Sequence, residues 1–358
     1  MRYEARIDRL RAGLDAANVD GLLVTNLTNV RYLTGFSGTN GQLLVWPGGA
    51  VFFSDPRYGA RATELVRGAE VDIYPFRLRE VLPDRLSAAR VRRLGIEAET
   101  MTVAGRDDLG GSLGDTELVA TRSAVEVHRR AKDADEIARI REAVFVADDA
   151  FGWVLGRLQP GRTEREVALD LEVRMRTHGA EDVSFEPIVG SGPLSAHIHH
   201  TPGDRVLERG DVVLLDFGAR CDGYCSDLTR TVVLGTASAR HRDVYARLLD
   251  AQMAGIDALE AGASGVAIDG AARAVIEDAG EGSAFGHGLG HGVGLDVHEA
   301  PRLHWGSEDA LVAGDVVTVE PGVYHTGWGG MRIEDCVLVT SEGAEVLTGA
   351  PKKELIEL

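Results

Sequence analysis

Hydrophobic positions in the first third of the chain alternate between helical spacing and short apolar runs. The opening segment places Ile7, Leu10 and Leu14 on one face of a helix. Further helical patterns cover 57–67 and 78–91. The apolar runs between these helical patterns predict strands within residues 21–26, 42–47, 50–55, 71–76 and 94–99. Strands that alternate with helices in this way indicate an α/β domain.

The pattern then changes to two longer helices. The first is predicted to begin at Asp133, with an acidic first turn, and to end before Pro160 and Gly161. The second is predicted to begin near Thr163, because TERE matches a capping box in which the side chains of the first and fourth residues satisfy free backbone N–H groups.

The later part of the chain favours hairpins over crossover connections. Strands are expected within 211–219, 223–234, 315–324 and 331–339, and helices near 239–260 and 265–279. This order predicts an α+β domain with a largely antiparallel sheet. Because charge rises and strand character ends between Ser123 and Lys132, we predict an α/β domain over residues 1–124 and the α+β domain over 125–358.

Composition narrows the possible partners. The 358 residues include 38 Lys and Arg against 56 Asp and Glu, a net charge of -18 that disfavours nucleic acid and anionic membranes as partners. No apolar run reaches the roughly 18 residues that span a bilayer. Three cysteines and no apolar leader predict a reducing, cytoplasmic setting. A zinc site at Cys221 and Cys225 is disfavoured, because structural zinc usually takes four closely grouped ligands.

Two aspartates are predicted to share one face of a hairpin. Asp216 ends an apolar run, where a carboxylate is costly unless it is paired or binds a metal. Asp222-Gly223 is a favoured two-residue hairpin loop and would place Asp216 opposite Thr229. Asp227 lies two residues before Thr229, so both carboxylates face the same way, with backbones roughly 7 to 8 Å apart. A turn or an ion pair is the alternative role for Asp216 alone.

Two glutamates repeat this arrangement. Glu320 follows an apolar strand, Glu334 lies in the next strand, and the Gly-rich return HTGWGG connects them. A hairpin loop centred on Gly327 would place the two glutamates directly opposite each other. Glu320 alone is equally consistent with a turn residue or a ligand, and Glu334 alone is better explained as an edge-strand residue. The doubled pattern favours a metal site for both.

The segment FGHGLGHGVGLDVHEAP, residues 285–301, has glycine at every second position from Gly286 to Gly294. This period of two predicts an extended chain with a bare face for close approach of another backbone. In that conformation His287 and His291 are roughly 13 Å apart and cannot bind one metal. His298 joins His291 only if the chain bends near Gly294, so we expect it to act as an acid or base rather than as a ligand.

Taken together, LLDFGA, SDLTRT, HGLGHGVGLDVHE, VEPGVY and RIED resemble the motifs of the pita-bread metallopeptidases, in the prolidase and aminopeptidase P branch. NVRYLTGFSG, residues 29–38, is similar to the N-terminal domain of that branch. The resemblance therefore covers nearly the whole chain. It implies that the second domain is an α+β pita-bread domain with a curved, largely antiparallel sheet, and that the protein is a homodimer.

The resemblance also implies the roles of individual residues. The ligands of a dinuclear site, with Asp227 and Glu334 bridging, would be Asp216, Asp227, His291, Glu320 and Glu334. Such oxygen-rich ligands with one imidazole suit two Mn, Co or Zn ions. His199 and His298 match histidines that contact substrate and carry protons. Arg302 matches an arginine that holds a dipeptide carboxylate, a bidentate task suited to Arg.

Two positions depart from the family pattern. Leu289 stands where the middle of the glycine stretch often has threonine, a change expected to matter little. Ile198 replaces a proline that often precedes the first of these histidines, so His197 and His200 stay open as alternatives to His199. The activity implied is hydrolysis of Xaa-Pro bonds in a proline-containing peptide, as a dipeptidase, with aminopeptidase action on longer peptides as the alternative. A non-catalytic binding protein and a metal-free creatinase-like enzyme are disfavoured, because all five ligand positions are filled.

Overall fold

The computed structural model describes residues 2–358, and the chain divides into two compact units on either side of Arg129 and Arg130. The division lies a few residues beyond the boundary predicted after residue 124. The short helix α6 (Glu126–Arg129) ends the first unit, because its Arg129 is buried and donates a hydrogen bond to Asn29 Oδ1 (2.8 Å).

The first unit is a six-stranded mixed sheet in the order β4-β3-β2-β1-β5-β6. The strands are β1 (Gly21–Val24), β2 (Gln42–Trp46), β3 (Gly49–Ser54), β4 (Glu70–Ile73), β5 (Arg93–Glu97) and β6 (Glu117–Thr121). The helices are α1 (Tyr3–Ala12), α2 (Leu27–Thr34), α3 (Gly59–Leu65), α4 (Leu78–Ala89) and α5 (Val103–Gly110), with a 3-10 turn η1 (Pro56–Tyr58). The predicted strands and helices are confirmed, whereas α2, α5 and β6 were not predicted.

Two capped helices open the second unit. In α7 (Ala134–Leu155), the Asp133 side chain accepts from Glu136 N (3.0 Å) while Glu136 accepts from Asp133 N (2.9 Å). In α8 (Glu164–Thr177), Thr163 forms the predicted capping box. Two later helices, α9 (Ala239–Asp257) and α10 (Gly265–Asp278), lie within the predicted ranges.

The strands of the second unit form several small sheets. Their orders are β20-β12-β9-β8, β14-β13-β15-β18-β19, β11-β10-β7 and β16-β17. The bounds are β7 (Asp182–Val183), β8 (Ile188–Ser191), β9 (Val212–Phe217), β10 (Ala219–Cys221), β11 (Tyr224–Cys225), β12 (Leu228–Val233), β13 (Gly290–Gly292), β14 (Glu299–Leu303), β15 (Val316–Val319), β16 (Gly322–His325), β17 (Gly329–Arg332), β18 (Asp335–Thr340), β19 (Gly343–Val346) and β20 (Ile356–Glu357), with 3-10 turns η2 (Gly192–Ala196) and η3 (Gly282–Ala284). Every strand pair in the second unit is antiparallel except β12 with β20. The prediction of a largely antiparallel sheet is confirmed.

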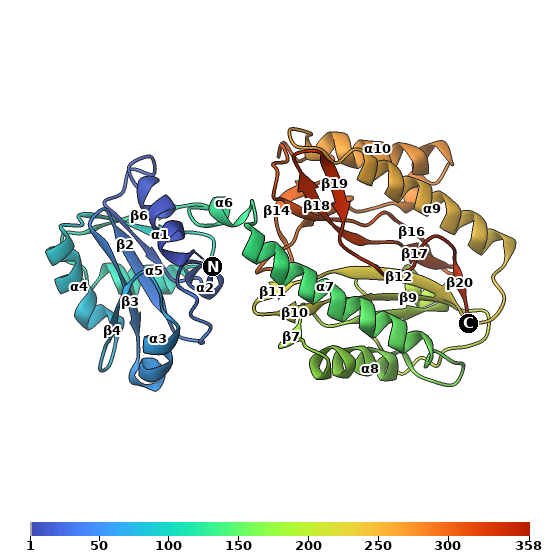
Figure 1. Cartoon of the computed structure of the whole chain (residues 1–358), viewed down its shortest axis with the longest axis horizontal. Coiled ribbons are helices and arrows are strands. Elements are labelled where there is room, and N and C mark those ends of the chain that lie inside the picture. The colour runs from blue at the N-terminus through green and yellow to red at the C-terminus, as the bar shows by residue number, and fades with distance from the viewer. Residues whose placement is uncertain (1) are drawn as a thin grey trace. The chain divides into compact units, whose positions relative to one another are not determined.

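Within this unit the helices cover the sheets from two sides. In Figure 1, α7 and α8 lie on one side and α9 and α10 on the other, and each pair has its own apolar core. Val213, Leu215 and Phe217 of β9 pack in the core beside α7 and α8. Since strand side chains alternate faces, Asp216 points away from that core, toward β17, whose Arg332 donates to it.

No helix among residues 2–358 is both long and apolar enough to cross a membrane. The three cysteines, Cys221, Cys225 and Cys336, are free and buried. None of the three belongs to the group of potential metal ligands found within residues 2–358.

Candidate metal centre

The hairpin between β9 and β12 aligns the two aspartates. Asp222 and Gly223 form its tip in left-handed backbone conformations, with φ of 45° and 88°. Asp216 lies opposite Thr229, and this continuous register places Asp227 diagonally across from Asp216 on the same face. The predicted register is confirmed.

The two glutamates lie opposite each other at a break between two ladders. Val319 of β15 pairs with Asp335 of β18, and Gly322 of β16 pairs with Arg332 of β17. Glu320 and Glu334 fall between these pairs at the same register. Their backbones bond elsewhere, because Glu320 N donates to Leu289 O (2.8 Å) and Glu334 N donates to Thr229 O (3.1 Å). These two backbone hydrogen bonds connect the glutamates to the segments that carry the other candidate ligands.

Glycines allow the chain around His291 to lie close to its neighbours. A Cβ atom at Gly290 would stand 2.0 Å from Thr318 O, and one at Gly292 would stand 2.3 Å from Ala300 O. The bare face predicted from the glycine spacing thus lets β13 fit between β14 and β15. The extended strand is shorter than expected, since the register shifts between His291 and Gly292.

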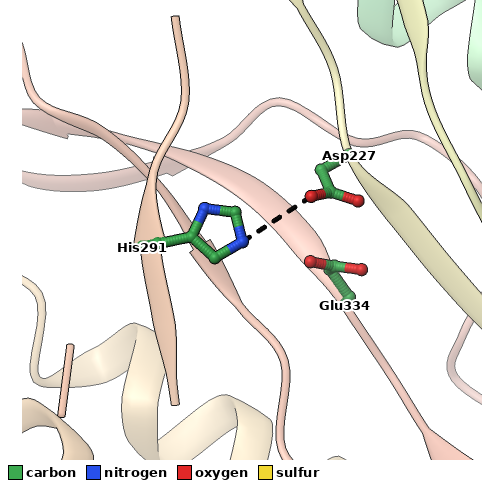
Figure 2. Close-up of side chains that lie close together, drawn as sticks. All are labelled: Asp227, His291 and Glu334. Atoms are coloured by element: carbon green, nitrogen blue, oxygen red, sulfur yellow. Dashed lines mark ion pairs between the residues drawn. The ribbon is translucent and has the colours of Figure 1, made fainter. Parts of the chain in front are cut away.

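The candidate ligands converge in the second unit. Ligand atoms of Asp227, His291 and Glu334 all lie within 4.8 Å of one another, and Figure 2 shows the three side chains pointing toward a common centre. His291 Nε2 is 3.7 Å from Asp227 Oδ2 and 3.4 Å from Glu320 Oε1. Asp216 is buried on the same face of the β9–β12 hairpin as Asp227.

Arg332 is a charged member of this cluster that the sequence reasoning did not single out. Its Nη2 atom is 2.5 Å from Asp216 Oδ2, and its Nε donates to Thr229 Oγ1 (3.0 Å). The Thr229 hydroxyl in turn donates to Glu334 Oε2 (2.6 Å). Arg332 lies two residues before Glu334, and this period of two was the available signal.

Burial among like charges raises the pKa of the candidate carboxylates. Desolvation and then the charges of Glu334 and Asp216 raise the pKa of Asp227 well above its ordinary value. Desolvation also raises the pKa of Glu334 well above its ordinary value, and that of Glu320 to about 7. The Arg332 guanidinium opposes each of these shifts.

These residues fit a centre for divalent cations. Carboxylate oxygens with one imidazole are a suitable ligand set for such ions. Asp216 Oδ1 is buried without a hydrogen-bond partner among residues 2–358, which is costly unless another group occupies that direction. Positive charge at the centre would also remove the repulsion that raises the carboxylate pKa values.

The cluster lines a cavity of about 1370 Å³. His298 also lines it, because the chain bends after Gly294 and brings the His298 ring to 4.3 Å from the His291 ring, centroid to centroid. Desolvation lowers the pKa of His298 to about 4. His199 lines the same cavity, whereas His200 Nε2 lies 2.7 Å from Glu164 Oε2.

Two further side chains of the cavity are Arg302 and His287. Arg302 is exposed on β14, lines the cavity and pairs in register with His291. His287 Nε2 is 2.9 Å from Tyr324 Oη, which accepts from Arg332 Nη1 (2.9 Å). His287 is thus linked to the cluster through a tyrosine and an arginine.

Comparison with protein families identifies both units. Residues 138–341 match metallopeptidase family M24, and residues 6–131 match the creatinase/prolidase N-terminal domain. The chain belongs to metallopeptidase family M24, a family whose chemistry depends on divalent metal ions. The expected fold class, an α/β N-terminal domain followed by an α+β pita-bread catalytic domain, is confirmed.

Similar proteins match this chain over nearly its full length. A solved Xaa-Pro dipeptidase from Bacillus anthracis has a TM-score of 0.97 and 40% identity, over 99% of this chain and 100% of that one. An X-Pro aminopeptidase from Thermotoga maritima has a TM-score of 0.91 and 33% identity over 99% and 100% of the two chains. The Xaa-Pro dipeptidase of Pyrococcus furiosus is 32% identical over 98% of this chain and 99% of that protein.

Proposed function

We propose that this metallopeptidase hydrolyses Xaa-Pro peptide bonds at a dinuclear metal centre, and that it acts as an Xaa-Pro dipeptidase. The observation that carries the proposal is the convergence of Asp227, His291 and Glu334 within 4.8 Å in a cavity that also holds candidate proton carriers. Relatives named Xaa-Pro dipeptidase, similar over their full length, support the choice of bond.

Five side chains would hold the two ions. Asp227 and Glu334 would bridge them, and Asp216, His291 and Glu320 would complete the set. When bound, the ions would supply Lewis acidity and activate a water molecule for attack on the scissile carbonyl. The ligand chemistry suits manganese, cobalt or zinc, and metal analysis of the purified protein tests which ion it carries.

Two histidines would handle protons. His298 has a pKa lowered by desolvation to about 4, so it is neutral at pH 7 and can accept a proton as well as donate a hydrogen bond. His199 lies in the same cavity. Their tasks would be to hydrogen-bond the developing oxyanion and to deliver a proton to the proline nitrogen, which must be protonated to leave.

Arg302 favours a dipeptide substrate. Its place on β14, in register with His291, brings a guanidinium to the same cavity as the metal ligands. A guanidinium there would bind the carboxylate that a dipeptide presents directly after proline, whereas a longer peptide places an uncharged amide at that point.

The test compares Ala-Pro with Ala-Pro-Ala-Ala and quantifies the released alanine. We expect Ala-Pro to be the better substrate, and Arg302→Leu to raise its KM while leaving the longer peptide little changed. Arg165→Leu removes an exposed arginine that pairs with Asp204 and is the matched control. Rapid cleavage of only the longer peptide would instead support aminopeptidase action, the activity named for the Thermotoga maritima neighbour.

Two properties complete the proposal. A homodimer is proposed from the family resemblance, and light scattering of the eluting protein tests it. A cytoplasmic setting is proposed because Cys221, Cys225 and Cys336 are free thiols, which a reducing compartment preserves.

A further inference from the structure

A buried ion pair lies beside the bend that carries His298. Lys132 Nζ is 2.7 Å from Glu299 Oε1, and the two side chains are only 1% and 10% exposed. Apart from this ion pair, the Lys132 ammonium has no hydrogen-bond partner among residues 2–358. Glu299 directly follows His298 and is the first residue of β14. Neither charge belongs to the proposed ligand set.

The Glu299 carboxylate fills the space inside the bend. A Cβ atom at Gly294 would stand 2.3 Å from Glu299 Oε1, so only a glycine leaves room for the carboxylate at this position. The bend is also held by backbone bonds, because Cys225 N donates to Gly294 O (2.8 Å) and Gly294 N donates to Asp296 O (3.0 Å). The chain from 294 to 299 is therefore fixed at both ends, by the β11 backbone and by the ion pair.

Lys132 is itself held in place. Its backbone N donates to Gly314 O (2.9 Å). Gly314 has a φ of 98°, and a Cβ atom added there would stand 3.1 Å from Lys132 O. Two residues earlier, Arg130 pairs with the fully buried Asp315 (3.0 Å). The next residue, Asp133, caps α7. The ammonium is thus presented to Glu299 from a segment with little freedom to move.

We propose that the Lys132–Glu299 pair is a positioning device that sets His298 in the cavity at its distance from His291. The proposal rests on the proposed function, in which His298 handles protons. A paired charge with a fixed counter-ion defines one position for the Glu299 carboxylate, whereas an apolar pair of similar volume fills the space without defining direction. Proton transfer needs donor and acceptor within hydrogen-bond reach, so a small displacement of His298 lowers turnover.

The experiment uses the full-length protein with Lys132→Met, Glu299→Gln and the double variant Lys132→Met/Glu299→Leu. The measurements are metal content, kcat and KM for Ala-Pro, melting temperature, and hydrogen–deuterium exchange of the segment 294–299 in metal-free protein. Arg174→Met is the matched control, because Arg174 pairs with Asp149 (2.7 Å) between α8 and α7, away from the cavity.

We expect Lys132→Met and Glu299→Gln to keep the wild-type metal content while kcat falls about 10- to 100-fold and exchange across 294–299 becomes faster. The double variant should recover the melting temperature, since replacing both charges by apolar groups removes the unpaired buried charge. Its kcat should stay low. Arg174→Met should lower the melting temperature and leave kcat unchanged.

Recovery of kcat together with melting temperature in the double variant would overturn the proposal, because the pair would then serve stability alone. Loss of metal in Lys132→Met would also overturn it, since the pair would then act on the ligands. If the wild-type protein cleaves no Xaa-Pro peptide, the proposed function fails, while unchanged exchange across 294–299 in Lys132→Met rejects the positioning role separately.

Discussion

The carboxylate of Asp227 lies among three others, and each of them makes its ionisation harder. Desolvation contributes most, followed by the charges of Glu334, Asp216 and Glu320, and Arg332 offsets only part of this cost. Without metal, one or more of these groups must hold a proton that the unfolded chain would release. The cluster is therefore destabilising in the metal-free protein and becomes favourable only when cations are bound.

Asp227→Asn should act in opposite directions on the metal-free and metal-loaded protein. With a chelator at pH 7, the amide needs no proton in order to be buried, so the substitution should stabilise the fold by on the order of 1–3 kcal/mol. With metal added, the variant should gain less stability than wild type and should lose activity. Calorimetry with and without chelator measures both effects. Asp250→Asn, which removes one exposed carboxylate from α9, is the control, and an equal rise in that variant would refute the explanation.

Arg332→Met should destabilise the metal-free protein, the opposite of the effect expected for Asp227→Asn. Arg332 is 2% exposed and provides the counter-charge of Asp216, so its removal leaves a buried carboxylate unpaired. Breaking such a pair costs about 3 kcal/mol or more. Chemical denaturation of the chelated variant measures the loss. A chelated Arg332→Met as stable as wild type would show that Asp216 holds its proton and does not need the arginine.

The sequence predicted the acidic candidates because Asp216 and Glu320 follow apolar strands, where a carboxylate is conspicuous. The hairpin registers then added Asp227 and Glu334 on the same faces. Arg332 has no such signal alone, since an arginine in a strand is most often an exposed edge residue. Sequence spacing also could not choose among His197, His199 and His200. That choice depends on which way the turn after η2 directs each ring, and Glu164, far away in the sequence, pairs with His200.

At the scale of elements, β13 shows why glycine alternates with other residues. Gly290 faces the backbone of β15 and Gly292 faces the backbone at the start of β14. A larger residue at either position would push these strands away, so the glycines allow His291 to lie between them. The position of the imidazole is therefore set by backbone packing together with the hydrogen bond between its Nδ1 and Gly292 O (3.1 Å).

Gly290→Ala should displace β13 and His291 with it. The added Cβ would stand 2.0 Å from Thr318 O, a backbone atom that cannot move without distorting β15. We expect a loss of about 2–4 kcal/mol in stability together with a lower metal content. Gly286→Ala is the matched control from the same segment, because nothing lies within 4 Å of its added Cβ.

Melting temperature and metal analysis of the two variants test this explanation. Gly286→Ala should match the wild type in both measurements. Similar losses in both variants would show that the glycines are needed for conformational freedom of the whole segment, and wild-type behaviour in both would show that β13 can move away from β15 at little cost.

The hairpin registers were predictable because a tight turn fixes every pair that follows it. Asp222-Gly223 set the β9–β12 register, and the loop centred on Gly327 set Glu320 opposite Glu334. Helix α2 was not predicted, because it has only eight residues and depends on its caps. Asn26 accepts from Thr28 N (2.9 Å), and Gly35 ends the helix with a φ of 80°.

At the scale of the whole molecule, metal binding and folding are linked through protons. Carboxylates with raised pKa values keep protons in the folded, metal-free state that the unfolded chain has lost, so their contribution to stability falls as pH rises. The buried histidines act oppositely. Desolvation lowers the pKa of His287 and His298 to about 4 from an ordinary 6.5, and this contribution to stability rises with pH only between those two values.

The two trends separate above pH 6.5, where the last prediction applies. From there to about pH 8, the histidines become largely neutral in both states, while Glu320, with a pKa of about 7, still binds a proton mainly in the folded state. The raised pKa values of Asp227 and Glu334 act in the same direction. The free energy of unfolding of chelated protein should therefore decrease with pH across this range. With metal present, the slope should reverse, because deprotonated ligands bind cations more tightly as pH rises.

Urea unfolding at several pH values, with chelator and with manganese, measures both slopes. A chelated Asp227→Asn/Glu334→Gln variant should lose most of the pH dependence, and a slope that persists in that variant would place the responsible groups outside the cluster.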